Sequence, residues 1–94
     1  MVKNKVYREV PVDAYNRFVG KITEPTGEAI AKAMDKFVSN PPKKIDHSLT
    51  VSVRADRSIR KVPLQSHLNF VAYCAKNQLQ VGLVLGQAMK NYFK

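Results

Sequence analysis

The chain of 94 residues has no tryptophan, a single cysteine and no long apolar run. The lone Cys74 excludes an intrachain disulfide and a cysteine metal site, which is typical of proteins in the reducing cytoplasm. The longest apolar-rich run, LQVGLVLGQAM, is too short to cross a bilayer. The start, MVKNKVYREV, lacks the apolar segment of a secretion signal. We therefore expect a cytoplasmic protein with no membrane partner.

Acidic residues are scarce and unevenly placed. All seven lie in residues 1–56, together with ten Lys and Arg, whereas residues 57–94 carry six bases and no acid. The net charge is +9. A basic excess of this size favours nucleic acid as the partner, because counterions released from phosphates drive association. Judged by charge alone, membrane surfaces, ribosomal particles and acidic proteins are the alternatives.

The residues needed for catalysis are also missing. His47 and His67 are the only histidines, and neither has a neighbouring carboxylate pattern that would suggest a metal site. No glycine-rich phosphate loop is present, and Cys74 falls on the apolar side of its expected helix, as a buried thiol does. We expect no catalysis, no cofactor, no metal and no small-molecule substrate.

One pattern occurs twice. YREVPVDAYNRFV, residues 7–19, returns 52 positions later as IRKVPLQSHLNFV, residues 59–71, with five identities. In both copies a Val-Pro pair stands where a strand would end and a helix begin, since proline suits the first turn of a helix. Each copy is followed by a second apolar helical segment. The repeat predicts two similar units.

In the first unit, alternation predicts a strand over residues 3–10, with Val6 and Val10 on one face and Lys5 and Tyr7 on the other. An amphipathic helix from Val12 to about residue 22 follows, and after a break at 23–27 a second helix covers about 28–39.

In the second unit, the alternation of SLTVSVR predicts a strand over residues 48–54, and a shorter strand over 58–62 is the alternative. A third helix is expected to bury an edge that includes Leu68, and a fourth covers about 80–93. Gly82 and Gly86 lie one turn apart on that last helix, which would let another helix approach closely.

This order of strand, helix and helix, given twice, resembles the ribbon-helix-helix DNA-binding family, of which the Arc and MetJ repressors are members. The resemblance implies an α+β fold in which residues 1–39 and 48–94, joined by a linker at 40–47, form one compact domain. Two strands would pair as a short antiparallel ribbon over four helices. The chain would then be a tandem, single-chain form of what is usually a dimer, as in some plasmid-encoded accessory proteins. Arg8 and Arg60 depart from the family pattern, because they stand where members bury an apolar strand residue.

The resemblance also implies double-stranded DNA as the partner, with the ribbon in the major groove. The base-reading candidates are Lys5, Tyr7, Thr50, Ser52 and Arg54; Ile59 and Lys61 replace the last three if 58–62 is the strand. Phosphates would meet the starts of the second helices, at Thr26, Gly27 and Glu28 and at Gln80 and Val81. Further basic candidates for phosphate contacts are Lys3, Arg17, Lys21, Lys43, Lys44, Arg57, Arg60 and Lys61.

The expected function is therefore a DNA-binding transcriptional regulator, such as a repressor, or a relaxosome-type accessory factor that is nucleoid-associated. A fused pair of units could also bind another copy of itself on a longer site. The alternative from another class is a small basic phage- or plasmid-encoded inhibitor or adaptor that binds an acidic protein. RNA binding is a weaker third option, because the aromatic residues are expected in the core and leave little surface for base stacking.

Overall fold

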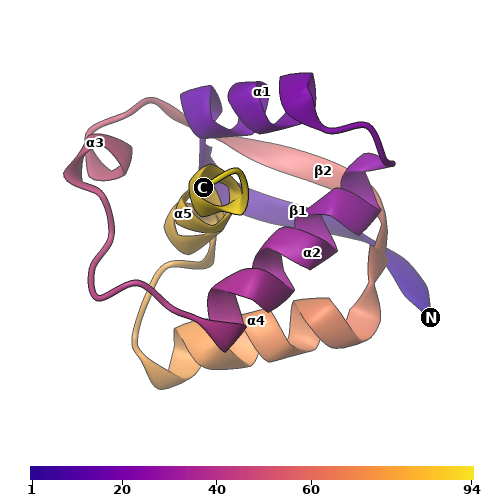
Figure 1. Cartoon of the computed structure of the whole chain (residues 1–94). Helices are drawn as coiled ribbons and strands as arrows, with labels where there is room; N and C mark the ends of the chain where they lie inside the picture. The colour runs from indigo at the N-terminus through magenta and orange to yellow at the C-terminus, as the bar shows by residue number, and fades with distance from the viewer.

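The computed structural model describes all residues from 1 to 94 and shows strand, helix and helix in that order, twice. A short fifth helix lies between the two sets. The elements are β1 (Val2–Pro11), α1 (Val12–Lys21), α2 (Thr26–Ser39), α3 (His47–Thr50), β2 (Arg54–Pro63), α4 (Leu64–Lys76) and α5 (Val81–Tyr92). The fold is α+β, with one two-stranded antiparallel sheet packed against helices (Figure 1). No helix combines the length and the apolar character that a bilayer crossing requires.

Proline ends both strands and begins the helix that follows each of them. Pro11 and Pro63 are the last strand residues and flank α1 and α4 on the N-terminal side. Proline lacks an N–H and fixes φ near the helical value, so a strand can turn into a helix there without a connecting loop. The Val-Pro junctions expected from the repeat are present in both units.

The two strands, which we call the ribbon, pair in a register that repeats with the sequence. Val6 pairs with Ser58 at the centre of the ladder. Adding 52 to the β1 residue of a pair and subtracting 52 from its β2 residue gives another pair: Val2–Pro63 becomes Pro11–Arg54, and Lys5–Ile59 becomes Tyr7–Arg57. Beyond the ladder, Leu64 N–H donates to Met1 O at 3.0 Å and Val12 N–H to Val53 O at 2.9 Å. The strand over 58–62 is therefore the correct alternative, as part of a longer β2.

Each strand contains one irregular residue near its end. Glu9 and Lys61 have φ values of 53° and 55°, in the left-handed region that residues other than glycine rarely adopt. The backbone N–H of Glu9 donates to Asp56 Oδ1 at 3.0 Å, and that of Lys61 to Asn4 Oδ1 at 3.1 Å. The register shifts across these positions. Such bulges change which side chains face the core.

The bulge overturns the expected face of β1. Tyr7 and Val10 are both buried although they are three residues apart, and Val6 is 63% exposed. In a regular strand Val6 and Val10 would share a face, and Tyr7 would lie on the other. The extra residue at Glu9 lets Val10 turn inward together with Tyr7. The prediction that Lys5 and Tyr7 face outward is therefore wrong: Tyr7 is buried and Lys5 is half-buried.

The segment 48–54 is not a strand, although its residues alternate. It begins with α3, and of its apolar residues only Leu49 is buried, whereas Val51 and Val53 are 70% and 77% exposed. The hydroxyl of Thr50 donates to His47 O at 2.6 Å, and local bonds of this kind compete with strand pairing. In addition, the paired edge of β1 is already occupied by β2. The alternation of apolar and polar residues thus predicted a strand at a place where the structure has α3.

The core lies between the ribbon and the helices, with α2 and α5 at its centre. The helices exchange strands between units: α2 packs on β2, and α5 packs on β1. Phe37 meets Phe70 and Tyr73 edge to face, and Phe18 meets Tyr92 in the same way. Neither unit could bury its apolar residues without the other. The fully buried large side chains are Val10, Pro11, Phe18, Ile30, Met34, Val62, Phe70, Cys74, Val84, Leu85 and Met89.

Two expectations about the helices need correction. Leu68 is 49% exposed, so α4 buries the side that carries Phe70 and Cys74 and not the edge that carries Leu68. Gly82 and Gly86 do mark a close approach, but of a strand end and not of another helix. A Cβ at Gly82 would overlap the backbone oxygen of Arg8, and one at Gly86 would lie 2.7 Å from the Pro11 ring.

Candidate nucleic-acid interface

The outer face of the ribbon presents six exposed side chains. Three come from each strand, at positions that again differ by 52: Asn4, Val6 and Arg8, and Asp56, Ser58 and Arg60. The residues between them, Tyr7 and Ile59, are buried. We call these six residues the ribbon face. The alternation in this central part of the ribbon is regular, so one side meets solvent and the other meets the core.

Arg8 and Arg60 lie on this face, on either side of the central Val6–Ser58 pair. Arg60 was expected among the phosphate contacts and Arg8 was not, and both side chains are exposed. Neither side chain makes a hydrogen bond or an ion pair within the chain; the two ion pairs are Lys32–Glu24 and Lys90–Asp46. Both guanidinium groups are therefore available to an external partner.

The ribbon carries most of the net charge of the molecule. β1 contains three basic residues and one acid, and β2 contains four basic residues and one acid, which gives +5 of the total +9. Asp56, one of the two acids, already accepts the backbone N–H of Glu9. This concentration of charge on a narrow two-stranded element produces a positive potential toward solvent.

The structure places several predicted base-reading residues elsewhere. Tyr7 points into the protein, where its hydroxyl lies 2.7 Å from Nδ1 of His67. Burial raises the pKa of Tyr7 above its ordinary value of 10.0. Burial, and then the positive charge of Lys5, lowers the pKa of His67 below 6.5, which favours the neutral imidazole. Tyr7 therefore belongs to an internal polar pair and not to the ribbon face.

Thr50, Ser52 and Arg54 do not form an outward strand face either. The hydroxyl of Ser52 donates to Leu49 O at 3.1 Å. Arg54 donates to Gln80 Oε1 at 3.1 Å and to Thr50 O at 2.9 Å. Its guanidinium thus connects the segment before β2 to the start of α5. The prediction that these three residues form an outward strand face is wrong, and their polar groups are hydrogen-bonded within the chain.

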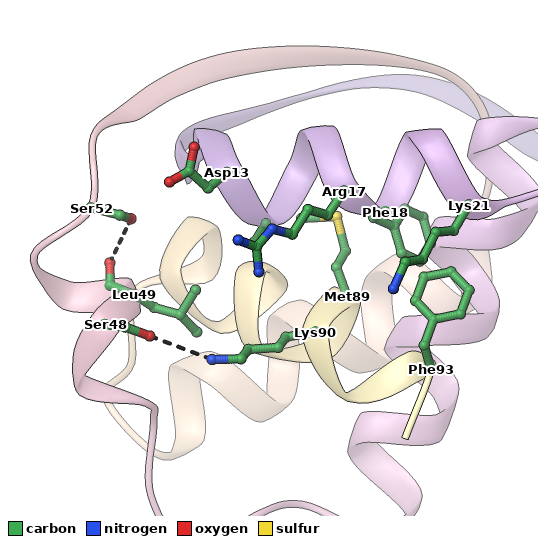
Figure 2. Close-up of a pocket in the computed structure, with 11 residues that line it drawn as sticks. Asp13, Arg17, Phe18, Lys21, Ser48, Leu49, Ser52, Met89, Lys90 and Phe93 are labelled. Atoms are coloured by element: carbon green, nitrogen blue, oxygen red, sulfur yellow. Dashed lines mark hydrogen bonds between the residues drawn. The ribbon is translucent and has the colours of Figure 1, made fainter.

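The remaining basic candidates divide by position. Lys3 and Lys61 are exposed on the ribbon. Arg57 is half-buried, with its guanidinium carbon 5.1 Å from the centre of the Tyr15 ring. Lys43 and Lys44 lie in the connector between α2 and α3, where Lys44 lines a groove that contains no ribbon residue. Arg17 and Lys21 are on α1 beside α5, also in a pocket without ribbon residues (Figure 2).

The starts of α2 and α5 flank the ribbon. The backbone of Gly27 in α2 packs against the carbonyl oxygens of Arg60 and Lys61, and that of Gly82 in α5 packs against those of Arg8 and Glu9. Neither helix has a side chain that caps its first N–H groups. Glycine is needed at both places because a Cβ would overlap the strand backbone.

A groove lies at each of these contacts. One, of about 580 Å³, is lined by Pro25–Glu28 of the α2 start and by 58–61 of β2. The other, of about 430 Å³, is lined by Gln80–Leu83 of the α5 start and by 6–9 of β1. Thr26, Gly27 and Val81 are therefore beside the ribbon, as expected. Glu28 lines the first groove and its carboxylate opposes an anion there.

The residues missed by sequence reasoning are Asn4, Val6, Arg8, Asp56 and Ser58. A signal for Arg8 was present: it is identical to Arg60 in the repeat, and an unpaired arginine is far easier to place on a surface than in a core. The bulge positions gave no such signal, since Glu9 and Lys61 are not glycine.

Two other observations concern reactive groups. Cys74 is fully buried, and burial raises the pKa of its thiol to about 11, which suppresses the nucleophilic thiolate. No group of three or more His, Cys, Asp or Glu side chains is placed to hold a metal ion.

Comparison of the chain with models of known protein families, with curated protein sequences and with solved structures finds no significant match.

Proposed function

We propose that this chain binds double-stranded DNA, with the ribbon face in the major groove and the starts of α2 and α5 on the phosphates at either side. In this proposal the two units form a pseudo-symmetric ribbon-helix-helix domain within one chain. The protein would act as a transcriptional regulator or as an accessory factor at a DNA-processing site.

The observation that carries the proposal is the placement of Arg8 and Arg60. Both are exposed, unpaired and related by the same offset of 52 that relates the pairs of the ladder. Two equivalent arginines on an antiparallel ribbon can address two equivalent positions of a duplex. The major groove of B-DNA admits a two-stranded ribbon, and arginine can hold guanine by two hydrogen bonds worth about 1–3 kcal/mol of discrimination.

The flanking helix starts support the same orientation. Each is held directly against a ribbon strand by a glycine contact, at Gly27 and Gly82, and each lacks a capping side chain. Free N–H groups and the positive end of the helix dipole attract phosphate. A duplex that meets the ribbon face would therefore meet two further anion-binding elements on its backbone.

The test compares two double variants that remove the same charge from different places. Arg8→Ala with Arg60→Ala changes the ribbon face, and Lys76→Ala with Lys94→Ala removes two exposed cations outside the ribbon. Binding to a fluorescent random-sequence duplex is followed by anisotropy from about 50 to about 200 mM salt. We expect the wild-type affinity to fall by at least about tenfold over this range.

The ribbon variant should lose at least about tenfold in affinity at low salt, and its dependence on salt should be shallower. The control variant should lose no more than about threefold. Circular dichroism and thermal unfolding show whether both variants remain folded. Equal losses in the two variants, or no duplex binding by the wild type, would overturn the proposal and leave an acidic protein as the better partner for the basic surface.

A further inference from the structure

A pocket of about 250 Å³ lies between α1, α3 and α5, and no ribbon residue lines it (Figure 2). Its floor is apolar and belongs to the core: Phe18 and Met89 are each 1% exposed, and Leu49 is 5% exposed. Phe93 forms one edge. Leu49 comes from α3, so the segment that was expected to be a strand supplies one wall.

Three cationic side chains surround the opening of this pocket. Arg17 and Lys21 extend from one face of α1, and Lys90 of α5 lines the same pocket with its ammonium 3.4 Å from the hydroxyl oxygen of Ser48 (Figure 2). Arg17 and Lys21 make no hydrogen bond or ion pair. The ammonium of Lys21 lies 5.4 Å from the centre of the Phe93 ring.

Only part of this positive charge is balanced within the chain. Lys90 is paired with Asp46 at 2.6 Å, and Asp13 is the one acidic residue that lines the pocket. The unpaired charges of Arg17 and Lys21 lie one helical turn apart on α1, and Lys90 lines the same pocket, so these like charges repel one another. An anion placed between them would relieve that repulsion.

The second unit has a groove at the corresponding place, and it differs in chemistry. That groove lies between α2 and α4 and is lined by Asp35, Val38, Ser39, Gln65, Ser66 and Asn69. It contains no cation, and Ser66 donates to Asp35 Oδ2 at 3.0 Å across it. Asn69 stands 52 residues after Arg17. The cationic opening therefore occurs in one unit only, and the repeated fold does not require it.

We propose that this pocket binds a small amphipathic anion, such as a medium-chain alkyl carboxylate. The apolar part would pack on Phe18, Leu49 and Met89, and the carboxylate would lie among Arg17, Lys21 and Lys90. Sites with an apolar floor and a few convergent polar groups are typical of small ligands, and this volume is near the lower end of their range, which limits the ligand to roughly ten heavy atoms. The proposal is independent of DNA binding.

The experiment uses three probes with the same chain and different head groups: octanoate, octanol and octylammonium. Each is titrated into the isotopically labelled protein below its aggregation concentration, and the methyl signals of Leu49 and Met89 are followed by NMR. We expect saturable shifts at these methyl groups with octanoate, an affinity at least about tenfold weaker for octanol, and no saturation with octylammonium, because the head group meets three cations.

Two double variants locate the site. Arg17→Gln with Lys21→Gln should weaken octanoate binding by about tenfold, whereas Lys3→Gln with Lys76→Gln removes the same charge elsewhere and should change it by less than about twofold. Octanol binding as tight as octanoate binding, shifts spread over the whole surface, or equal effects of the two variants would each overturn the proposal. Duplex binding by the Arg17 and Lys21 variant, measured in parallel, should be nearly unchanged, which separates failure of this site from failure of the DNA interface.

Discussion

Gly82, at the start of α5, lies in direct contact with the backbone oxygen of Arg8 in β1. The contact joins a helix of the second unit to a strand of the first, and Gly27 makes the corresponding contact with Arg60. These two glycines hold the helix starts against the ribbon. The interface proposed for DNA depends on this arrangement, since it places the free N–H groups of both helices beside the ribbon face.

Replacing Gly82 by alanine should therefore destabilise the protein. The new Cβ would overlap backbone atoms of Arg8 and Glu9, which cannot move without shifting the strand, so we expect a loss of about 2–3 kcal/mol in unfolding free energy. Gly20 provides a matched control, because it is in a helix, exposed, and has nothing within 4 Å of an added Cβ. Gly20→Ala should stabilise by about 0.5–1 kcal/mol. Urea unfolding of both variants checks the signs; a neutral Gly82→Ala would contradict the contact.

Replacing the bulge residue Glu9 by glycine should give a more stable protein than replacing it by alanine. Its φ of 53° is unfavourable for any residue that has a Cβ, whereas glycine adopts it freely. Glu9→Gly and Glu9→Ala both remove the carboxylate, so their difference isolates the backbone effect. The glycine variant should be more stable by about 1 kcal/mol in denaturant unfolding. The same order is expected at Lys61, and an alanine variant as stable as the glycine variant would show that the bulge is absent.

Protonation of His67 should weaken the fold in mildly acidic solution. Burial, and then Lys5, lowers the pKa of the imidazole in the folded state below 6.5, so between the two values the unfolded chain binds a proton that the folded protein does not. The free energy of unfolding should consequently rise with pH up to about 6.5. At higher pH, His67 should no longer change the stability. Unfolding free energies measured between about pH 5 and 8 test this. In His67→Gln the slope in this window should become shallower, and an unchanged slope would assign it to another group.

The thiol of Cys74 should be nearly inert in the folded protein. It is fully buried, and burial raises its pKa from 9.0 to about 11, which lowers the thiolate fraction near neutral pH by roughly a hundredfold. An aromatic disulfide reagent should react rapidly with Cys74 in denaturant. Under native conditions it should react only as fast as the protein opens and exposes the thiol. Fast reaction of the native protein would mean that α4 does not bury Phe70 and Cys74 as described.

The sequence predicted the four long helices and the two strand-to-helix junctions, but not α3. Helical periodicity placed α2 and α5, and the Val-Pro pairs at Pro11 and Pro63 placed the change from strand to helix. Alternation was less informative. It favoured a strand at 48–54, but only pairing can stabilise a strand, and β1 has its partner in β2.

The candidate site was harder to predict than the fold because one residue per strand decides which side chains face outward. With the bulge at Glu9, Tyr7 and Val10 both face inward and Arg8 faces outward. Without the bulge, Tyr7 and Val10 would lie on opposite faces of β1. Neither Glu9 nor Lys61 is a glycine, which is the residue typical of a bulge with positive φ, so only the pairing of the two strands reveals the bulges. Of the predicted basic candidates, Lys3, Arg57, Arg60 and Lys61 lie on the ribbon, whereas those of α1 and of the connector at 40–46 do not.

Binding of DNA at the ribbon face is measured most directly by a titration of the ¹⁵N-labelled protein with a short DNA duplex, followed residue by residue through backbone amide shifts. We predict that the largest changes fall on 4–8 of β1, 56–60 of β2 and the first turns of α2 and α5. Changes centred instead on α3, the connector at 40–46 or the pocket beside Arg17, with the ribbon unaffected, would contradict it.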